Sequence, residues 1–315
     1  MKQRRKAAVA KLSIFSNTFL VVAKAVVGLT IGSVAVLSEA IHSGIDLIAS
    51  SITYIAVRKS GEPADISHPY GHGKIEDISG MLEALLIFIA AGWIIYQAIG
   101  KLLHPQPLIL AWWGIGVMGT SSIVNLFVSR RLFRVGKETD SVALMADGWH
   151  LRTDVYTSAG VMLGLLLIAF GGVLSPGRDL SWLDPAVAMA VALLIMRAAW
   201  HLTRKSVEEL LDSALPATEQ EKINEYFRGQ RTRVLSFHRL RTRKAGPARF
   251  IDIHIVLDPD MTVAESHKLS HHIADDIRKL FTDASTSIHV EPCDGRCKSE
   301  CLENCSDSNR QKTGT

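Results

Sequence analysis

Six long apolar segments occupy the N-terminal part of this 315-residue chain and limit what it can fold into more than any other feature. A helix needs roughly 20 mainly apolar residues to cross a hydrocarbon core about 30 Å thick. Hydrophobic residues form 48% of the chain, and its mean hydropathy is +0.18. We therefore predict an integral membrane protein with six transmembrane helices. The segments cover approximately residues 11–32, 35–57, 79–101, 108–130, 142–171 and 182–203.

Basic side chains gather at one set of segment ends and predict the orientation. Cytoplasmic loops of membrane proteins are enriched in Lys and Arg, so we expect both termini in the cytoplasm. As the location we expect the plasma (inner) membrane, although the charge pattern does not identify the membrane. The first apolar segment is too long for the core of a cleavable signal peptide. The basic residues are Lys2, Arg4, Arg5 and Lys6 before the first segment, Arg58, Lys59 and Lys74 after the second, Arg130, Arg131, Arg134 and Lys137 after the fourth, and Arg204 and Lys205 after the sixth.

The pattern after about residue 204 is charged and mixed, which predicts a soluble domain. Its periodicity indicates a helix over 206–228, strands in VLSFHRLRTR and RFIDIHIVLD, a helix over 263–281 and a last strand in TSIHVEP. We expect an α+β fold of the ferredoxin-like or metallochaperone-like αββαβ kind, with the helices on one face of the sheet. The predicted organisation is a tail over 1–8, an all-α six-helix transmembrane domain over 9–203, the α+β domain over 204–293 and a polar, disordered tail over 294–315.

Two histidine and carboxylate pairs interrupt the apolar segments. His42 and Asp46 are four residues apart in the second segment, and His150 and Asp154 repeat this spacing in the fifth. Residues four apart lie on one face of a helix, so each helix offers one imidazole and one carboxylate toward a common point. Two nitrogen and two oxygen donors form a tetrahedral shell suited to zinc, and the two carboxylates neutralise a divalent cation.

The cost of burial argues against a chance arrangement of these pairs. A central Asp in a membrane helix costs on the order of 2.5 to 3.5 kcal/mol on insertion scales. A bound cation, protons or a water-filled cavity would compensate, whereas hydrogen bonds that only hold helices together explain two matched pairs less well. Glu39 and Asp147 each precede a histidine by three residues. They either line the cation path or belong to a solvated helix end or a salt bridge to Arg152.

The loop between the second and third segments carries a further set of metal-ligand types. DISHPYGH places Asp65, His68 and His72 within eight residues, and Pro69 and Gly71 bend the backbone there. An Asp and two His supply three ligands and leave a position for water or another residue. A plain polar loop at the membrane surface is the alternative that the sequence leaves open.

The predicted soluble domain is also rich in histidine. His238, His254 and His289 fall on its three strands, Glu291 shares a face with His289, and His267 lies on its second helix. The chain ends in a cysteine-containing segment in which successive cysteines are four residues apart. A helix there would align thiolates for a soft cation, while a flexible tail in a reducing cytosol is the default. The four cysteines are Cys293, Cys297, Cys301 and Cys305.

These features together resemble the cation diffusion facilitator family. The resemblance covers about residues 9–293 and rests on HSGID and HLRTD in the second and fifth segments, the loop DISHPYGHGKIED, and six spans followed by an α+β domain. Members of this family are proton-coupled exporters of divalent metals and not enzymes. The resemblance implies a transport site of His42, Asp46, His150 and Asp154. Histidine at both variable positions looks like the zinc-preferring pattern, so we expect Zn2+ with Cd2+ and Co2+ tolerated.

The resemblance also implies accessory sites and partners. It assigns the loop triad to a second, cytoplasm-facing metal site, and it pairs Lys74 with Asp212 in a charge interlock near the membrane surface. Relatives hold a binuclear zinc site at the positions of His238, His254, His267, His289 and Glu291, where some have Asp in place of Glu. We expect a homodimer whose partners are metal ions, protons and the lipid bilayer, and no nucleic acid.

Two other function classes remain as alternatives. An intramembrane hydrolase would need an open zinc position and a general base, but the chain lacks HExxH and the four membrane ligands close the shell. A membrane-anchored zinc sensor would use the soluble-domain ligands but has no need for polar pairs in the bilayer. Zinc flux through the purified protein in liposomes separates a sensor from an exporter.

Overall fold

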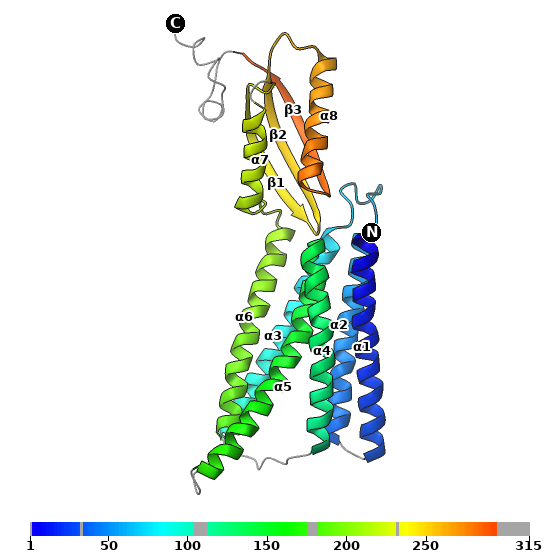
Figure 1. The fold of residues 1–315 in the computed structure, drawn as a ribbon, viewed down its shortest axis with the longest axis vertical. Helices are drawn as coiled ribbons and strands as arrows, with labels where there is room; N and C mark the ends of the chain where they lie inside the picture. Colours follow the sequence, from blue (N-terminus) through cyan, green and yellow to red (C-terminus); the bar gives the residue numbers. More distant parts are fainter. Residues whose placement is uncertain (1, 32–33, 104–111, 175–181, 231–232, 295–315) are drawn as a thin grey trace. The chain divides into compact units, whose positions relative to one another are not determined.

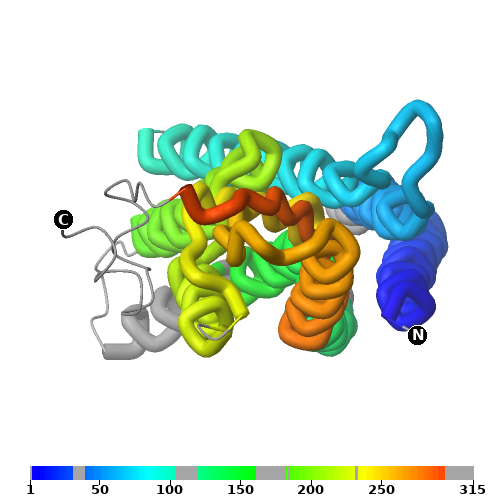
Figure 2. Tube along the Cα trace, turned by 90° about the horizontal axis from the view of Figure 1, so that it is seen from above, coloured from blue at the N-terminus to red at the C-terminus, as the bar shows by residue number. Residues whose placement is uncertain are grey.

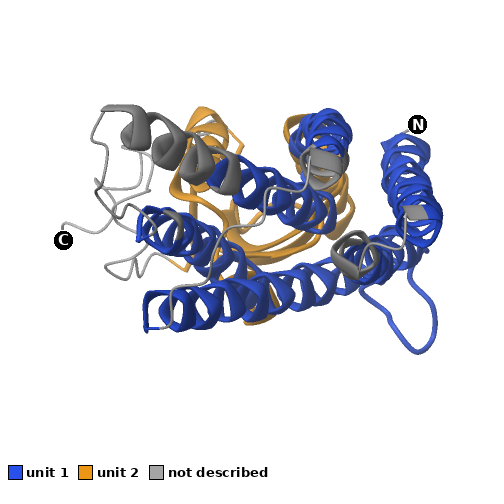
Figure 3. Ribbon diagram, turned by 90° about the horizontal axis from the view of Figure 1, so that it is seen from below, with its two compact units in different colours: residues 1–207 blue, residues 208–315 orange. Residues whose placement is uncertain are grey.

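The computed structural model describes residues 2–31, 34–103, 112–174, 182–230 and 233–294. It divides into two compact units, residues 1–207 and residues 208–315 (Figure 3). The first unit consists of long helices, and the second combines helices with a small sheet (Figure 1).

Six long helices account for the first unit, one at each apolar segment (Figure 1). Four of them, α1, α2, α3 and α6, are long and apolar enough to cross a membrane when the described residues are considered. The prediction of a helical membrane domain is therefore confirmed. The helices are α1 (Lys2–Ile31), α2 (Val34–Ser60), α3 (Lys74–Leu103), α4 (Trp112–Thr139), α5 (Val142–Leu174) and α6 (Leu183–Leu210).

Two apolar clusters hold this helical unit together. One joins α1, α2, α4 and α5 around Val57, Leu132 and Leu151, and the other joins α3, α5 and α6 around Ile87 and Ile195. α5 takes part in both clusters, which makes it the central helix of the unit. The loop after α2 projects beyond the helices as a blue arc near the N-terminal helix (Figure 2). The polar pairs of the sequence thus lie on two helices, α2 and α5, that pack against each other.

Three strands and two helices form the second unit. The elements are α7 (Ala217–Gly229), β1 (Ser236–Ala245), β2 (Ala248–Leu257), α8 (Val263–Leu280) and β3 (Ala284–Pro292). β2 lies in the middle of the sheet, antiparallel to β1 and parallel to β3. Gly246 adopts a φ of +56° in the tight turn between β1 and β2, a conformation that glycine allows without steric cost. α8 supplies the long crossover that a parallel pair needs.

The core of this unit lies between the sheet and its helices. Ile251, Ile253 and Ile255 alternate along β2 and are buried, so these positions face the core, whereas His254 between them points to the other face. Both helices therefore cover one face, as the sequence predicted (Figure 1). β1 bulges between His238 and Arg241. The helix residues in this core are Ile223 and Phe227 of α7, and Ile273 and Ile277 of α8.

The predicted helix over 206–228 is wrong. α6 continues from the membrane segment to Leu210, and a separate helix, α7, begins only at Ala217. Pro216 explains the break, because proline lacks the backbone donor of a helix interior and disfavours helical geometry in the residue before it. Asp212 lies in the connecting turn with a φ of +57°, not on the first helix of the soluble domain as predicted.

Candidate metal centre

The two intramembrane pairs meet crosswise. His150 Nε2 of α5 lies 3.1 Å from Asp46 Oδ1 of α2. His42 Nε2 of α2 lies 3.9 Å from Asp154 Oδ1 of α5. Each histidine therefore faces the carboxylate of the other helix rather than its own i+4 partner. This arrangement places imidazole nitrogens and carboxylate oxygens from both helices around one region, as the ligand spacing requires.

Three of the four residues already surround a common point. Ligand atoms of His42, Asp46 and Asp154 all lie within 4.8 Å of one another. His150 lies outside this triplet but contacts it through Asp46. Asp46 is 4% exposed and His150 7%, whereas 52% of the His42 side chain is accessible. His42 therefore stands at the open side of the cluster and His150 at its buried side.

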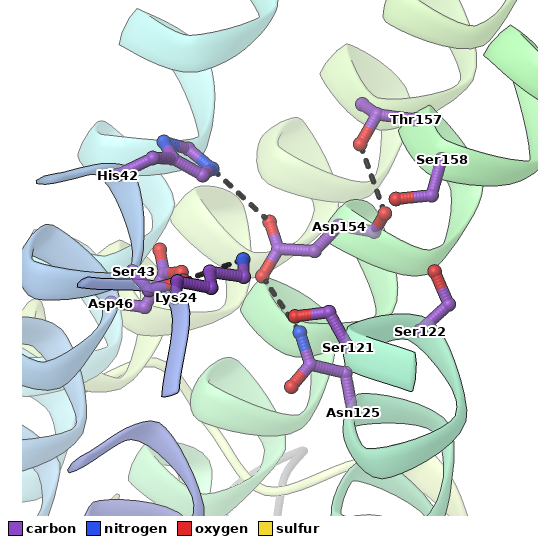
Figure 4. Close-up of a pocket in the computed structure, with 10 residues that line it drawn as sticks. All are labelled: Lys24, His42, Ser43, Asp46, Ser121, Ser122, Asn125, Asp154, Thr157 and Ser158. Carbon is purple, nitrogen blue, oxygen red and sulfur yellow. Dashed lines mark hydrogen bonds and ion pairs between the residues drawn. The ribbon is translucent and has the colours of Figure 1, made fainter. Parts of the chain in front are cut away.

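A cavity of 190 Å³ contains the triplet (Figure 4). Asn125 of α4 donates a hydrogen bond to Asp154 Oδ2 at 3.3 Å and fixes that carboxylate from the side away from His42. Ser121 and Ser122 of α4 and Lys24 of α1 also line the cavity. These residues were not predicted from the sequence. The signal was present, because TSSIVN is a polar run within the fourth apolar segment and Lys24 is a charge within the first.

Glu83 of α3 forms a second layer behind His150, and this residue was not predicted from the sequence either. It is 1% exposed, its Oε1 accepts a hydrogen bond from Thr53 at 2.7 Å, and its Oε2 lies 3.9 Å from His150 Nδ1. Neither Glu83 Oε2 nor His150 Nδ1 has a hydrogen-bond partner, although both atoms are buried. His150 therefore has a carboxylate on each side of its ring. An acidic residue inside the third apolar segment was the signal.

Asp147 belongs to the same buried layer. It is fully buried and accepts a hydrogen bond from Ser50 at 3.0 Å. Ser50 in turn contacts Ser13 at 2.9 Å and accepts from Asn17 at 2.8 Å, so the network reaches α1. Asp147 is thus not a solvated helix end. The side chain of Glu39 lies outside the described part of the structure.

The structure brings the side chains of the loop triad together. Ligand atoms of Asp65, His68 and His72 lie within 4.8 Å of one another. Asp65 Oδ1 lies 3.4 Å from His68 Nδ1, and Asp65 Oδ2 lies 3.5 Å from His72 Nε2. The backbone N–H of His68 donates to Asp65 at 2.6 Å, and this bond holds the pKa of the carboxyl below its usual value. The left-handed Gly71, with a φ of +83°, helps to fold the chain back.

The open face of the sheet carries a third cluster. His238, His254 and His289 lie side by side in register on β1, β2 and β3. Glu291 Oε1 lies 2.8 Å from His254 Nδ1 and 3.7 Å from His289 Nε2, and its Oε2 lies 3.4 Å from His238 Nε2. The hydrogen bond with His254 lowers the pKa of Glu291. Ligand atoms of His238, His254 and Glu291 all lie within 4.8 Å of one another, and His289 lies beside them.

His267 is not brought to this cluster within one chain. It lies on α8, which covers the opposite face of the sheet, and its ring packs against His271 with centroids 4.5 Å apart. The pairing of Lys74 with Asp212 joins residues of different units and stays a prediction; Asp212 accepts a hydrogen bond from Arg243 at 3.2 Å. Cys293 is partly buried, and Cys297, Cys301 and Cys305 lie outside the described residues.

Comparison with known proteins places the chain among metal transporters. The cation efflux transmembrane domain matches residues 10–211, and the cytoplasmic domain of cation efflux proteins matches residues 215–293. An uncharacterized transporter of Synechocystis is 36% identical over 261 residues, which cover 83% of this chain and 82% of that protein. The cation-efflux pump FieF of Shewanella oneidensis is 30% identical over 282 residues, covering 90% of this chain and 92% of the pump.

A plant protein matches over a similar stretch. Metal tolerance protein C1 of Arabidopsis thaliana is 30% identical over 298 residues, which cover 90% of this chain and 61% of that protein. The two domain matches follow the same order as the helical and α+β parts of the structure. The chain therefore belongs to the cation efflux, or cation diffusion facilitator, family, and it is an integral membrane protein that exports divalent metal cations.

Proposed function

We propose that this protein exports Zn2+ from the cytoplasm in exchange for protons, with His42, Asp46, His150 and Asp154 as the transport site. The observation that supports this proposal is the crosswise approach of the two pairs, at 3.1 Å and 3.9 Å, beside a cavity within the helical unit. Both of these contacts join one helix to the other. A cation that binds there replaces its hydration shell with ligands from both α2 and α5.

The donor set favours zinc as cargo. Two imidazole nitrogens and two carboxylate oxygens match the tetrahedral preference of Zn2+, and the two negative charges balance the cation. Cobalt and cadmium accept similar ligands, so we expect the transporter to tolerate Co2+ and Cd2+ as cargo. The hydroxyl and amide groups of α4 give the cavity a polar wall in which water can accompany the ion.

Protons are suitable counter-substrates for this site. Metal binding requires neutral imidazole and ionised carboxylate, so protons and metal compete for the same atoms. Histidine has an unperturbed pKa of about 6.5 and exchanges a cation for a proton near physiological pH. Alternating access then follows if the helices that carry the ligands open the site to one side of the membrane at a time.

The two accessory clusters fit zinc by their donor chemistry, and we assign them regulatory or structural roles. The loop site would consist of Asp65, His68 and His72, and the sheet site of His238, His254 and Glu291, with His289 beside it. A second copy of the chain would supply His267 to the sheet site. We further propose a homodimer in the plasma (inner) membrane with both termini cytoplasmic, a transport domain over 9–203 and a regulatory domain over 204–293.

Reconstituted protein tests this function. Proteoliposomes with a pH gradient and a fluorescent zinc indicator should show zinc uptake that depends on the gradient, together with proton movement in the opposite direction. Asp46→Ala and Asp154→Ala should abolish both fluxes because each removes a cavity ligand. Ser129→Ala serves as the control, since Ser129 is buried but bonds only to the Leu126 carbonyl of its own helix. Zinc flux at the parent rate in both Asp variants, or without proton movement, contradicts the proposal.

A further inference from the structure

A lysine of α1 reaches into the cavity that holds the metal ligands. Lys24 is 5% exposed, and its Nζ donates a hydrogen bond to Ser43 Oγ of α2 at 2.8 Å. Ser43 directly follows His42, and Lys24 lines the same cavity as Asp46 and Asp154 (Figure 4). A site for a divalent cation thus contains a positively charged side chain of the protein itself.

The charges of the cavity explain what this lysine does when no metal is bound. Asp46 and Asp154 place two carboxylates inside a membrane domain, where an uncompensated charge is costly. A lysine ammonium in the same cavity offsets one of these charges. Its four-carbon stem is flexible, and its three donors rotate freely, so it can move between a hydroxyl and a carboxylate.

When a divalent cation binds, the charge of Lys24 becomes unfavourable instead of favourable. The metal and the ammonium group carry like charges in a cavity of 190 Å³. Their repulsion weakens metal binding, and the metal and the ammonium group compete for the same two carboxylates. Ser43 offers the ammonium group a neutral acceptor in the same cavity, and the structure shows this contact. The ammonium group can therefore leave both carboxylates to a metal without losing its hydrogen bond.

We propose that Lys24 is a tethered competitor of the transported cation, which lowers metal affinity so that metal is released and the empty site can cross back. This inference rests on the proposed transport site and adds a specificity-determining residue to it. The contrasting view is that Lys24 only fastens α1 to α2 through Ser43. The two views predict opposite changes in metal affinity, because loss of a fastening contact cannot tighten binding.

Transport kinetics separate the two views. The variants are Lys24→Gln, which keeps a donor for Ser43 but removes the charge, and Lys24→Arg, which keeps the charge. Lys24→Gln should lower the zinc KM on the order of tenfold, since charges a few ångströms apart remain strongly coupled even at an effective dielectric constant of about 20. It should also lower kcat because release becomes slower. Lys24→Arg should restore a KM nearer the parent value than Lys24→Gln does.

The zinc KM values of the Lys24 variants can overturn the inference. An unchanged or higher KM in Lys24→Gln, or equal KM values in the Gln and Arg variants, shows that charge competition does not operate. Should Lys24→Gln not yield folded protein, Ser43→Ala tests the same point with the charge in place. Removing the neutral acceptor should raise KM, and an unchanged KM refutes the proposal. If the parent protein moves no zinc, the proposed function fails; if only the KM shifts are absent, the inference alone fails.

Discussion

Substitution of Glu83 tests how the candidate metal centre positions its buried histidine, His150. The carboxylate Oε2 lies 3.9 Å from His150 Nδ1, on the opposite side of the ring from the Asp46 contact. Metal-bound histidines commonly donate their second ring N–H to a carboxylate, which fixes the tautomer and ring orientation and makes the ligand nitrogen more basic. Glu83 is placed for this role when His150 Nε2 turns to a metal.

The expected magnitude follows from this geometry. Loss of such a partner typically reduces metal affinity by about 10- to 100-fold, which is about 1.4 to 2.8 kcal/mol at 25 °C. Glu83→Ala should reach this range, because it removes both the acceptor and the charge. Glu83→Gln keeps an acceptor of similar size and should lose less. Thr53→Val, which removes the hydroxyl that donates to Glu83 Oε1, should have a smaller effect than Glu83→Ala.

Cobalt binding to detergent-solubilised protein measures the effect without transport. The visible spectrum of Co2+ reports its coordination geometry, and a titration followed at these bands gives the dissociation constant. Thermal melting of each variant without metal controls for general destabilisation. If Glu83→Ala binds Co2+ with the parent affinity and an unaltered spectrum, Glu83 does not position His150, and the reasoning is refuted.

Three further predictions concern a buried ion pair of the helical unit and the histidine cluster on the sheet. Lys6 and Glu76 form a buried ion pair between α1 and α3, so Lys6→Met should lower stability by about 3 to 5 kcal/mol, and the double variant with Glu76→Gln should regain part of it; melting of the solubilised protein measures both. Because the hydrogen bond with His254 depresses the pKa of Glu291, its stabilisation is present above the usual Glu value of about 4.3 and lost as pH falls through the lower folded-state value. The stability gap between the metal-free parent and Glu291→Gln, measured by urea unfolding, should therefore close in acid. Zn2+ at 100 times its dissociation constant should stabilise the sheet domain by about 2.7 kcal/mol. This gain should disappear in His238→Ala, and a gain that persists there places the zinc elsewhere.

The sequence predicted the elements of the fold well where periodicity and length were decisive. Long apolar segments that cross a bilayer satisfy their backbone hydrogen bonds as helices, so six such segments predict six helices. The alternation around Ile253 and Ile255 of β2 identifies which face of the sheet is buried. The helix boundary near Pro216 was missed, because charged residues on both sides continue a helical pattern across the break. Pro216 indicates the helix break, because proline is disfavoured in a helix interior.

The sequence indicated the candidate ligands of the proposed site but not the contacts between them. A spacing of four shows that His42 and Asp46 share a helix face, yet it does not show that His42 meets Asp154 and that His150 meets Asp46. Those contacts depend on how α2 and α5 pack, which local spacing does not encode. Lys24 and Glu83 were overlooked for a different reason: each is an isolated charge in the interior of an apolar segment and does not belong to a histidine and carboxylate pair spaced by four.

The crosswise contacts between α2 and α5 make the proposed transport site sensitive to movement of one helix along the other. A slide of one helix along the other by a single residue, about 1.5 Å, changes both contacts together, because each contact spans the two helices. At the proposed transport site, an ion held by both helices would then lose ligands from both at once and would not stay attached to one helix. The residues proposed to hold the cargo are thus the same residues that hold α2 and α5 in register.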